Sequence, residues 1–185
     1  SFSEHTRAFL QVQNGCNSRC SYCIVPFARG PSRSVGQDEI LRSIAELVQR
    51  GYKEVVLTGI HLGEYGLDLP QPASLTRLVE AIEQQDLLPR LRLGSIEPRE
   101  LTDQLLELFV SSTRLCQHLH IPLQSGSDTV LRRMGRNYDT SFYRSRVEAA
   151  IKLLPDAFIA ADLIVGFPDE SETEFEETWH FINAL

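Results

Sequence analysis

Two spacings of apolar residues alternate along the chain. Short runs that are apolar at every second position, or at almost every position, are typical of β-strands. These runs are residues 6–13, 53–59, 91–96, 118–123 and 158–165. Longer runs with apolar residues three and four positions apart are typical of amphipathic helices. These runs are residues 37–51, 75–82, 101–112, 127–134, 140–154 and 172–182. The pattern therefore predicts strands and helices in regular alternation.

Residues with strong preferences for helix ends support these boundaries. Gly51 is a suitable C-terminal stop for the first helix, and Ser74 is a suitable N-cap for the second. Ser171 and Glu174 have the spacing of a capping box. After the first strand, Pro26, Gly30 and Pro31 interrupt the chain too often for regular structure.

The order of the elements predicts the fold class. Five strand–helix units in succession favour an α/β fold with a parallel sheet that curls into a partial or full barrel. The last strand, residues 158–165, is almost entirely apolar, as expected for a parallel strand buried on both faces. Functional residues of such folds gather where the strands end. The carboxyl ends of the strands are therefore the expected place for the functional residues.

Composition narrows the class of protein. The chain has 185 residues, enough for one domain with a substantial core, and its net charge of −7 gives no general attraction to nucleic acid. No apolar run approaches the length of a membrane span, and no segment resembles a signal peptide. Clustered cysteines without such a signal indicate metal ligation in a reducing compartment, and hence a cytoplasmic protein.

The candidate chemistry lies in the loop after the first strand. Three of the four cysteines, Cys16, Cys20 and Cys23, follow one another there with the spacing C-x3-C-x2-C. Thiolates this close suit a multi-iron centre or a zinc ion. Both centres usually have four protein ligands, so three thiolates would leave one position open to a small molecule.

This spacing, with an aromatic residue before the third cysteine, resembles the signature of the radical S-adenosylmethionine (SAM) enzymes. The resemblance implies a 4Fe–4S cluster and SAM as cofactors, with Cys16, Cys20 and Cys23 as the cluster ligands. It also implies that an electron from the cluster cleaves SAM to a 5′-deoxyadenosyl radical. A partial parallel βα barrel of six units belongs to this superfamily, and the sequence matches five of them, truncated before the sixth strand.

Further stretches resemble the methylthiotransferases of that superfamily. They are VVLTGIHLGEYG, SIEPREL, LCQHLHIPLQSGSD and DLIVGFPDE. The first two most resemble the branch that adds a methylthio group to N6-threonylcarbamoyladenosine next to the tRNA anticodon. Two substrates from sister branches stay open, isopentenyladenosine in tRNA and a ribosomal protein. A zinc-stabilised binding module without catalysis is the alternative from another class.

The resemblance also implies contacts with SAM at or near the strand ends. Tyr22 would lie beside the cluster and the adenine, and Gly59 and Gly166 would let the backbone pass close to SAM. A carboxylate suits the ribose hydroxyls, and an amide with a guanidinium suits the methionine carboxylate. The residues implied for these two roles are Glu97 and Asp162, and Gln124 and Arg136. For each of them, an ordinary packing, turn or surface residue is the alternative interpretation.

The same family carries parts that this sequence lacks. The resemblance implies an N-terminal domain with a second 4Fe–4S cluster and a C-terminal RNA-binding domain, so that residues 1–185 are an incomplete radical SAM core domain. The expected partners are tRNA, bound mainly by the missing domains, and a cellular electron donor. We also expect self-association through the last strand, because an apolar strand edge without a neighbour favours pairing with another chain.

Two other clusters have weaker signals. Cys116, His118 and His120 alternate along one strand and share a face, which would allow a second metal, although buried histidines more often satisfy hydrogen bonds. Local basic density that could meet a tRNA phosphate comes from Arg29, Arg33, Arg132 and Arg133. Solvated surface arginines are the ordinary alternative for this second group.

Overall fold

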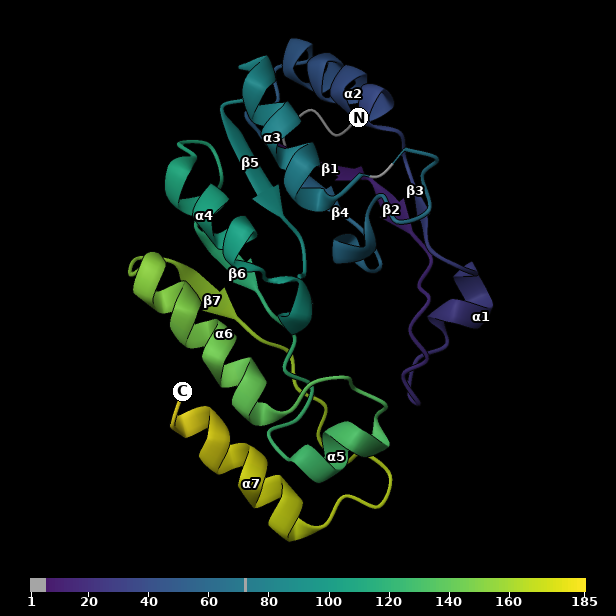
Figure 1. Cartoon of the computed structure of the whole chain (residues 1–185), viewed down its shortest axis with the longest axis vertical. Coiled ribbons are helices and arrows are strands. Elements are labelled where there is room, and N and C mark those ends of the chain that lie inside the picture. The colour runs from purple at the N-terminus through teal and green to yellow at the C-terminus, as the bar shows by residue number, and fades with distance from the viewer. Residues whose placement is uncertain (1–5, 72) are drawn as a thin grey trace.

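Five parallel strands form the central sheet of the protein (Figure 1). A computed structural model describes residues 6–71 and 73–185. The strands are β1 (Arg7–Gln11), β4 (Glu54–Thr58), β5 (Arg90–Leu93), β6 (His118–His120) and β7 (Phe158–Ala160). Strands β1, β4 and β5 pair in register, as do β6 and β7. Parallel bridges from Leu91 to Leu115 and from Ser95 to His120 join the two groups. The described part of the sheet therefore runs β1-β4-β5-β6-β7 and forms a partial barrel.

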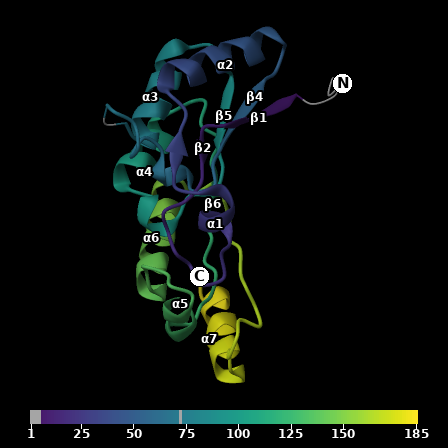
Figure 2. The ribbon, with the colours of Figure 1, turned by 90° about the vertical axis from the view of Figure 1, so that its right-hand side faces the viewer.

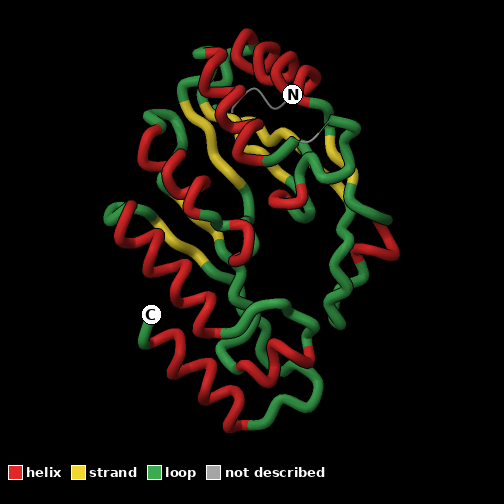
Figure 3. Tube along the Cα trace, in the orientation of Figure 1, coloured by secondary structure: helices red, strands yellow, loops and turns green. Residues whose placement is uncertain are grey.

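The main helices follow the strands along the chain. They are α2 (Gln37–Gln49), α3 (Leu75–Gln85), α4 (Asp103–Ser111), α5 (Asp128–Arg133), α6 (Thr140–Leu153) and α7 (Glu172–Asn183). Two short 3₁₀ helices, η1 (Leu62–Glu64) and η2 (Pro98–Glu100), follow β4 and β5. Figures 1 and 2 show α3, α4 and α6 stacked along the same side of the strands, and Figure 3 shows the sheet curving behind them. The predicted fold class is confirmed.

The core lies between the helices and the strands. In β4, Val55 and Leu57 are completely buried, and α3 buries Leu78 and Val79 against the sheet. Burial of apolar surface on this scale is the main source of stability for such a domain. None of the helices in the described part of the chain is both long enough and apolar enough to cross a membrane.

The predicted helix ends are confirmed. The Ser74 hydroxyl accepts a hydrogen bond from the backbone N–H of Arg77 at 3.2 Å. Ser171 and Glu174 form the predicted capping box at the start of α7. Gly51 has a φ of +91° just after α2 and closes its last turn. These caps satisfy backbone groups that the helix itself leaves unpaired.

The prediction that the segment after the first strand lacks regular structure was wrong. The segment after the cysteines contains a short helix, α1 (Val25–Arg29), and a strand, β3 (Arg33–Ser34), that pairs antiparallel with β2 (Gln13–Asn14). Pro26 falls in the first turn of α1, where its missing N–H would have no partner in any case. The pairing of β2 with β3 is a long-range contact that local sequence signals do not indicate.

The last strand is shorter and less buried than predicted. Strand β7 ends at Ala160, and the side chains of Phe158 and Val165 are 63% and 62% exposed. In the described residues β7 pairs only with β6, so no strand covers its other edge. Burial on both faces, which the apolar sequence predicted, is therefore not present here.

A charged cluster supports the amino end of the sheet. The Glu54 carboxylate, with a side chain only 10% exposed, forms ion pairs with Arg7 at 2.8 Å, Arg90 at 3.1 Å and Arg92 at 2.7 Å. These arginines come from both neighbouring strands, so Glu54 links β1, β4 and β5. Burial alone would raise the pKa of Glu54, but hydrogen bonds from Arg92 and Arg90 hold it below its usual range.

We predict that Glu54→Gln lowers the free energy of unfolding by about 1–3 kcal/mol at neutral pH, because it removes the charged partner of three arginines, of which Arg92 is largely buried. The lowered pKa stabilises the fold above the ordinary glutamate pKa of about 4.3, and this contribution is lost as the pH falls through the folded-state value. Denaturant unfolding of both proteins between pH 7 and pH 3 measures the difference, which should shrink as the pH falls.

Glu176→Gln, at an exposed position on α7, is the matched control and should change little. A Glu54→Gln protein as stable as the parent at pH 7 would contradict the role of this cluster.

Candidate functional site

The cysteine loop begins at the carboxyl end of the first strands, where the fold class predicted the site. Cys16, Cys20 and Cys23 are half-buried free thiols, and Cys116 is a buried free thiol elsewhere. Just before them, Gly15 has a φ of +73°, and a Cβ built there would lie 2.0 Å from the Pro31 carbonyl oxygen. Only glycine allows this close approach, which lets the Cys16 N–H donate to the Gly30 carbonyl at 3.1 Å.

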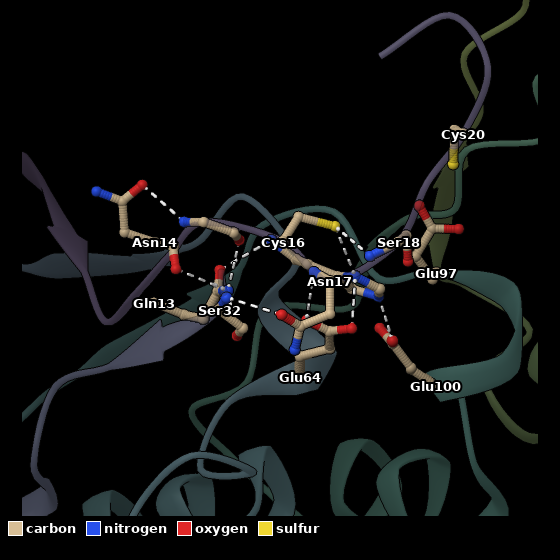
Figure 4. A network of polar contacts seen from close by, with 12 residues as sticks. Gln13, Asn14, Cys16, Asn17, Ser18, Cys20, Ser32, Glu64, Glu97 and Glu100 are labelled. Atoms are coloured by element: carbon tan, nitrogen blue, oxygen red, sulfur yellow. Dashed lines mark hydrogen bonds and ion pairs between the residues drawn. The ribbon is translucent and has the colours of Figure 1, made fainter. Parts of the chain in front are cut away.

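A buried amide holds the start of the loop. Gln13 is completely buried, and its Nε2 donates to the Gly15 carbonyl at 2.8 Å and to the Ser32 hydroxyl at 2.9 Å (Figure 4). Its Oε1 accepts from the backbone N–H of His61 at 2.8 Å. A Cβ at Gly59 would lie 2.9 Å from this same Oε1, so the packing of Gln13 already requires glycine at that position. Gln13 thus joins the loop to the segment after β4.

The far side of the loop rests on the end of α5. The Ser21 N–H donates to the Met134 carbonyl at 3.0 Å, and the Ser21 hydroxyl donates to the Arg133 carbonyl at 2.8 Å. Gly135, with a φ of +73°, lies against the loop, where an added Cβ would be 3.4 Å from the Arg19 carbonyl oxygen. The loop is therefore held at both ends by backbone-directed hydrogen bonds.

A cavity of about 210 Å³ opens beside the loop. Its lining includes Cys20, His61, Glu97, Glu100 and Arg136. It is a polar cavity next to a thiol, with three arginines, a histidine and two carboxylates in its wall. Such a cavity can receive a small polar molecule with its own charged groups.

Arg136 is the central cation of this cavity. Its side chain is 7% exposed and forms an ion pair with Glu97. Its Nη1 donates to the Cys20 sulfur and to the Tyr22 hydroxyl, each at 3.4 Å. The guanidinium carbon lies 4.9 Å from the centre of the Tyr138 ring, and the buried Nε has no partner among the described residues. The structure therefore brings Tyr22, Glu97 and Arg136 together near Cys20, and their contacts with SAM stay predictions.

The two tyrosines around Arg136 stay neutral. Burial raises the pKa of Tyr138 to about 12, although the neighbouring Arg136 favours its ionised form. Burial likewise raises the pKa of Tyr22. The guanidinium charge is consequently balanced by Glu97 and not by a phenolate.

On the other side of the loop, His61 lies among three acidic groups. Its Nδ1 is 3.4 Å from the Cys16 sulfur and 3.4 Å from Oε1 of Glu64, and its Nε2 contacts Glu100. Figure 4 shows the Glu64 and Glu100 carboxylates converging beneath Cys16. Burial alone would lower the pKa of His61, but Glu100, Cys16 and Glu64 raise it to about 9.

The remaining predicted SAM contacts lie at the β6–β7 edge. Gln124 has a φ of +68° and pairs with the chain after β7, and Asp162 lies 3.2 Å from Nε2 of His120. The Gly166 N–H donates to Glu170. None of the three lines the cavity beside Cys20. Their contacts with SAM, like that of Gly59, stay predictions.

The structure gives the residues of the possible second metal site separate partners. The His118 ring stacks on Phe158 with centroids 5.4 Å apart, and Nδ1 of His120 faces the Ser95 hydroxyl at 2.6 Å. Within residues 6–71 and 73–185, the ligand atoms of Cys116, His118 and His120 do not lie close enough together to share one metal ion.

In the basic group, Arg133 forms a two-fold hydrogen-bonded pair with Glu174, so its charge is balanced within the chain. Arg33 donates to the Arg29 carbonyl, and Arg132 donates to the Thr129 hydroxyl. The phosphate contact proposed for these arginines stays a prediction.

Sequence reasoning missed several residues that build the site. His61 and Glu64 are three residues apart directly after a predicted strand. Their position at a strand end was a signal in the sequence that both residues belong to the site. Gln13, Glu100 and Gly135 had no comparable signal, because their roles depend on contacts between segments far apart in the chain.

These residues fit the cofactors that the sequence suggested. Three half-buried thiols on one loop form a soft donor set, and Arg136, whose buried Nε has no partner among the described residues, lines the adjoining cavity. A partial parallel βα barrel with a cysteine loop at its strand ends is typical of enzymes that hold a metal cluster beside a small-molecule cofactor. Within that class, the chain belongs to the radical SAM superfamily, whose family model matches residues 10–182.

Relatives narrow the similarity to tRNA-modifying enzymes. The chain is 45% identical over 98% of its length to a threonylcarbamoyladenosine tRNA methylthiotransferase, MtaB, of Bacillus subtilis. It is 42% identical over 97% of its length to a tRNA-2-methylthio-N(6)-dimethylallyladenosine synthase of Carboxydothermus hydrogenoformans. The chain spans only about 40% of the length of these curated relatives.

Solved structures show the same fold at low identity. The radical SAM methyltransferase TsrM of Kitasatospora setae matches 96% of the chain with a TM-score of 0.78 and 17% identity, which covers 34% of that protein. The coproporphyrinogen III oxidase HemN of Escherichia coli matches 99% of the chain with a TM-score of 0.68 and 15% identity, and 42% of that protein is covered. The likeness supports the barrel and says nothing about the substrate.

We predict that Gly135→Val weakens cluster retention, because its Cβ would already be in van der Waals contact with the backbone of Arg19 and Cys20, which leaves little room for the two methyl groups beyond it. The left-handed backbone adds strain of about 1–3 kcal/mol for a side chain of this kind. Gly51→Val carries the same strain in open space and is the matched control. Iron per chain after anaerobic reconstitution should fall for Gly135→Val alone, and equal iron in the two variants would contradict the contact.

Proposed function

We propose that this chain is the radical SAM core of a tRNA methylthiotransferase that acts on N6-threonylcarbamoyladenosine next to the anticodon. The observation that carries the proposal is the loop of three half-buried thiols beside a polar cavity with a buried arginine. Similarity to MtaB over nearly the whole chain supports the substrate.

Cys16, Cys20 and Cys23 would hold a 4Fe–4S cluster, and the cavity beside Cys20 would receive SAM. When bound, the cluster supplies the electron that cleaves SAM. The chain's own residues hold the cofactors in position and keep water away from them. Because the loop is held at Gln13 and at Ser21, the thiols keep their relative positions before any cofactor binds.

Arg136 would orient SAM through its carboxylate. The guanidinium is already fixed by Glu97 and by the Tyr138 ring, so little side-chain entropy would be lost on binding. Its Nη1 also donates to the Cys20 sulfur, so the guanidinium would lie next to the bound cluster. Tyr22 and Glu97 would complete this end of the cofactor site, with Gly59, Gln124, Asp162 and Gly166 as further contacts.

The whole reaction needs parts beyond this core. We propose that residues 1–185 generate the radical, while a second 4Fe–4S cluster and an RNA-binding domain belong to other parts of the enzyme. A cellular electron donor would reduce the cluster, and tRNA would be bound mainly by those other parts. The apolar exposed edge at Phe158 and Val165 supports the further proposal that the isolated chain self-associates there.

Isopentenyl-type adenosine in tRNA is the second candidate substrate. The observation in its favour is the 42% identity to the dimethylallyladenosine synthase, close to the 45% identity to MtaB. Both candidates share the cofactors and the radical chemistry. They differ only in the group on the adenine nitrogen.

We predict that Cys16→Ala, Cys20→Ala and Cys23→Ala each abolish cluster retention, whereas Cys116→Ala leaves it intact. The reason is that the first three thiols share one loop, and Cys116 is buried away from it. Iron and sulfide per chain after anaerobic reconstitution give the measurement. A Cys20→Ala protein that keeps its cluster, or a Cys116→Ala protein that loses it, would sink this ligand assignment.

The substrate is tested in cells that carry the intact gene, a deletion, or a deletion complemented with a variant. We expect deletion to remove the methylthio group from threonylcarbamoyladenosine in tRNA, as measured by mass spectrometry of nucleosides. The parent gene and Cys116→Ala should restore it, and Cys20→Ala should not. Loss of methylthio-isopentenyladenosine instead would favour the second candidate, and unchanged nucleosides would exclude both.

A further inference from the structure

A second set of metal-binding atoms lies at the edge of the cysteine loop. The Cys16 sulfur, a ring nitrogen of His61 and a carboxylate oxygen of Glu64 all lie within 4.8 Å of one another, and all three residues are partly buried. The His61 and Glu64 side chains are only 12% and 14% exposed. Cys20 and Cys23 are not members of this set.

The spacing of these atoms matches a tetrahedral zinc ion. Zinc binds thiolate at about 2.3 Å and imidazole nitrogen at about 2.0–2.1 Å, so two tetrahedral ligands of these types lie about 3.5 Å apart. The Cys16 sulfur and Nδ1 of His61 are 3.4 Å apart, and Nδ1 is also 3.4 Å from Oε1 of Glu64. An ion could bind all three atoms with small side-chain adjustments.

A neighbouring carboxylate orients the histidine for this role. Nε2 of His61 contacts Glu100, which fixes the ring so that Nδ1 faces Cys16 and Glu64. A carboxylate behind a ligating histidine is the usual support of a zinc site. The backbone N–H of Asn17 also contacts Oε2 of Glu64 at 3.5 Å, which leaves Oε1 directed at the histidine.

We propose that the cluster-free chain binds one Zn²⁺ through Cys16, His61 and Glu64, with water as the fourth ligand. As the ion binds, the protons of the Cys16 thiol and of Nδ1 leave to solvent. Given the proposed role of Cys16 as a cluster ligand, the two metals compete for one thiolate. Zinc would then hold the start of the loop in place and delay cluster assembly until it is removed.

Zinc titration of the metal-free chain against a chromophoric chelator tests the site. We expect one Zn²⁺ per chain for the parent, Cys20→Ala and Cys23→Ala. Removal of a ligand in Cys16→Ala, His61→Ala or Glu64→Gln should abolish chelator-resistant binding. Glu100→Gln should weaken binding by about 10- to 100-fold, as for other residues that support a metal ligand.

Cobalt as a spectroscopic substitute keeps the test independent of variant folding. Co²⁺ in the parent should give a thiolate charge-transfer band with the intensity of one sulfur ligand. A band with the intensity of three sulfurs, or loss of zinc in Cys20→Ala, would assign the ion to the three cysteines and overturn the proposal. So would the absence of zinc binding to the parent. None of these results depends on iron retention, so failure of this site leaves the proposed function to its own test.

Discussion

The attachment of the cysteine loop at both of its ends is the constraint on which the site depends. The buried Gln13 amide holds its beginning against Gly15 and Ser32, and Ser21, near its other end, holds it against the end of α5. These contacts join the first βα unit to the fourth, so the shape of the loop depends on how both units pack. Burial of an amide with both of its ends satisfied stabilises one arrangement of the loop, because an unpaired buried amide would be costly.

Charge in the site falls into two groups, one beside Cys20 and one beside Cys16. On the Cys20 side, Arg136 provides a buried cation whose position is fixed by Glu97 and Tyr138. On the Cys16 side, His61 lies between Glu64 and Glu100. The chain carries a net charge of −7, so the local cation stands out against an acidic molecule. The Cys20 side is suited to an anionic group of a cofactor, and the Cys16 side to a metal cation.

Much of this architecture follows from local sequence signals. The alternation of strands and helices, the caps at Ser74 and Ser171, and the cysteine loop at a strand end depend on periodicity and short-range chemistry, which a single sequence contains. The β2–β3 pairing and the buried role of Gln13 depend on contacts between distant segments, and no local pattern indicates them. The exposure of β7 was also missed, since an apolar strand sequence predicts burial but cannot supply the neighbour that would provide it.

The central claim is that three thiolates hold a cluster with one position open to SAM beside Arg136. The most direct test is the electron paramagnetic resonance spectrum of the reduced, reconstituted protein with and without SAM. The account predicts that SAM changes the spectrum of the parent, and that Arg136→Ala needs about ten- to a hundredfold more SAM for the same change, the loss expected for a charge-assisted hydrogen bond. A fully loaded cluster whose spectrum does not respond to saturating SAM would contradict it.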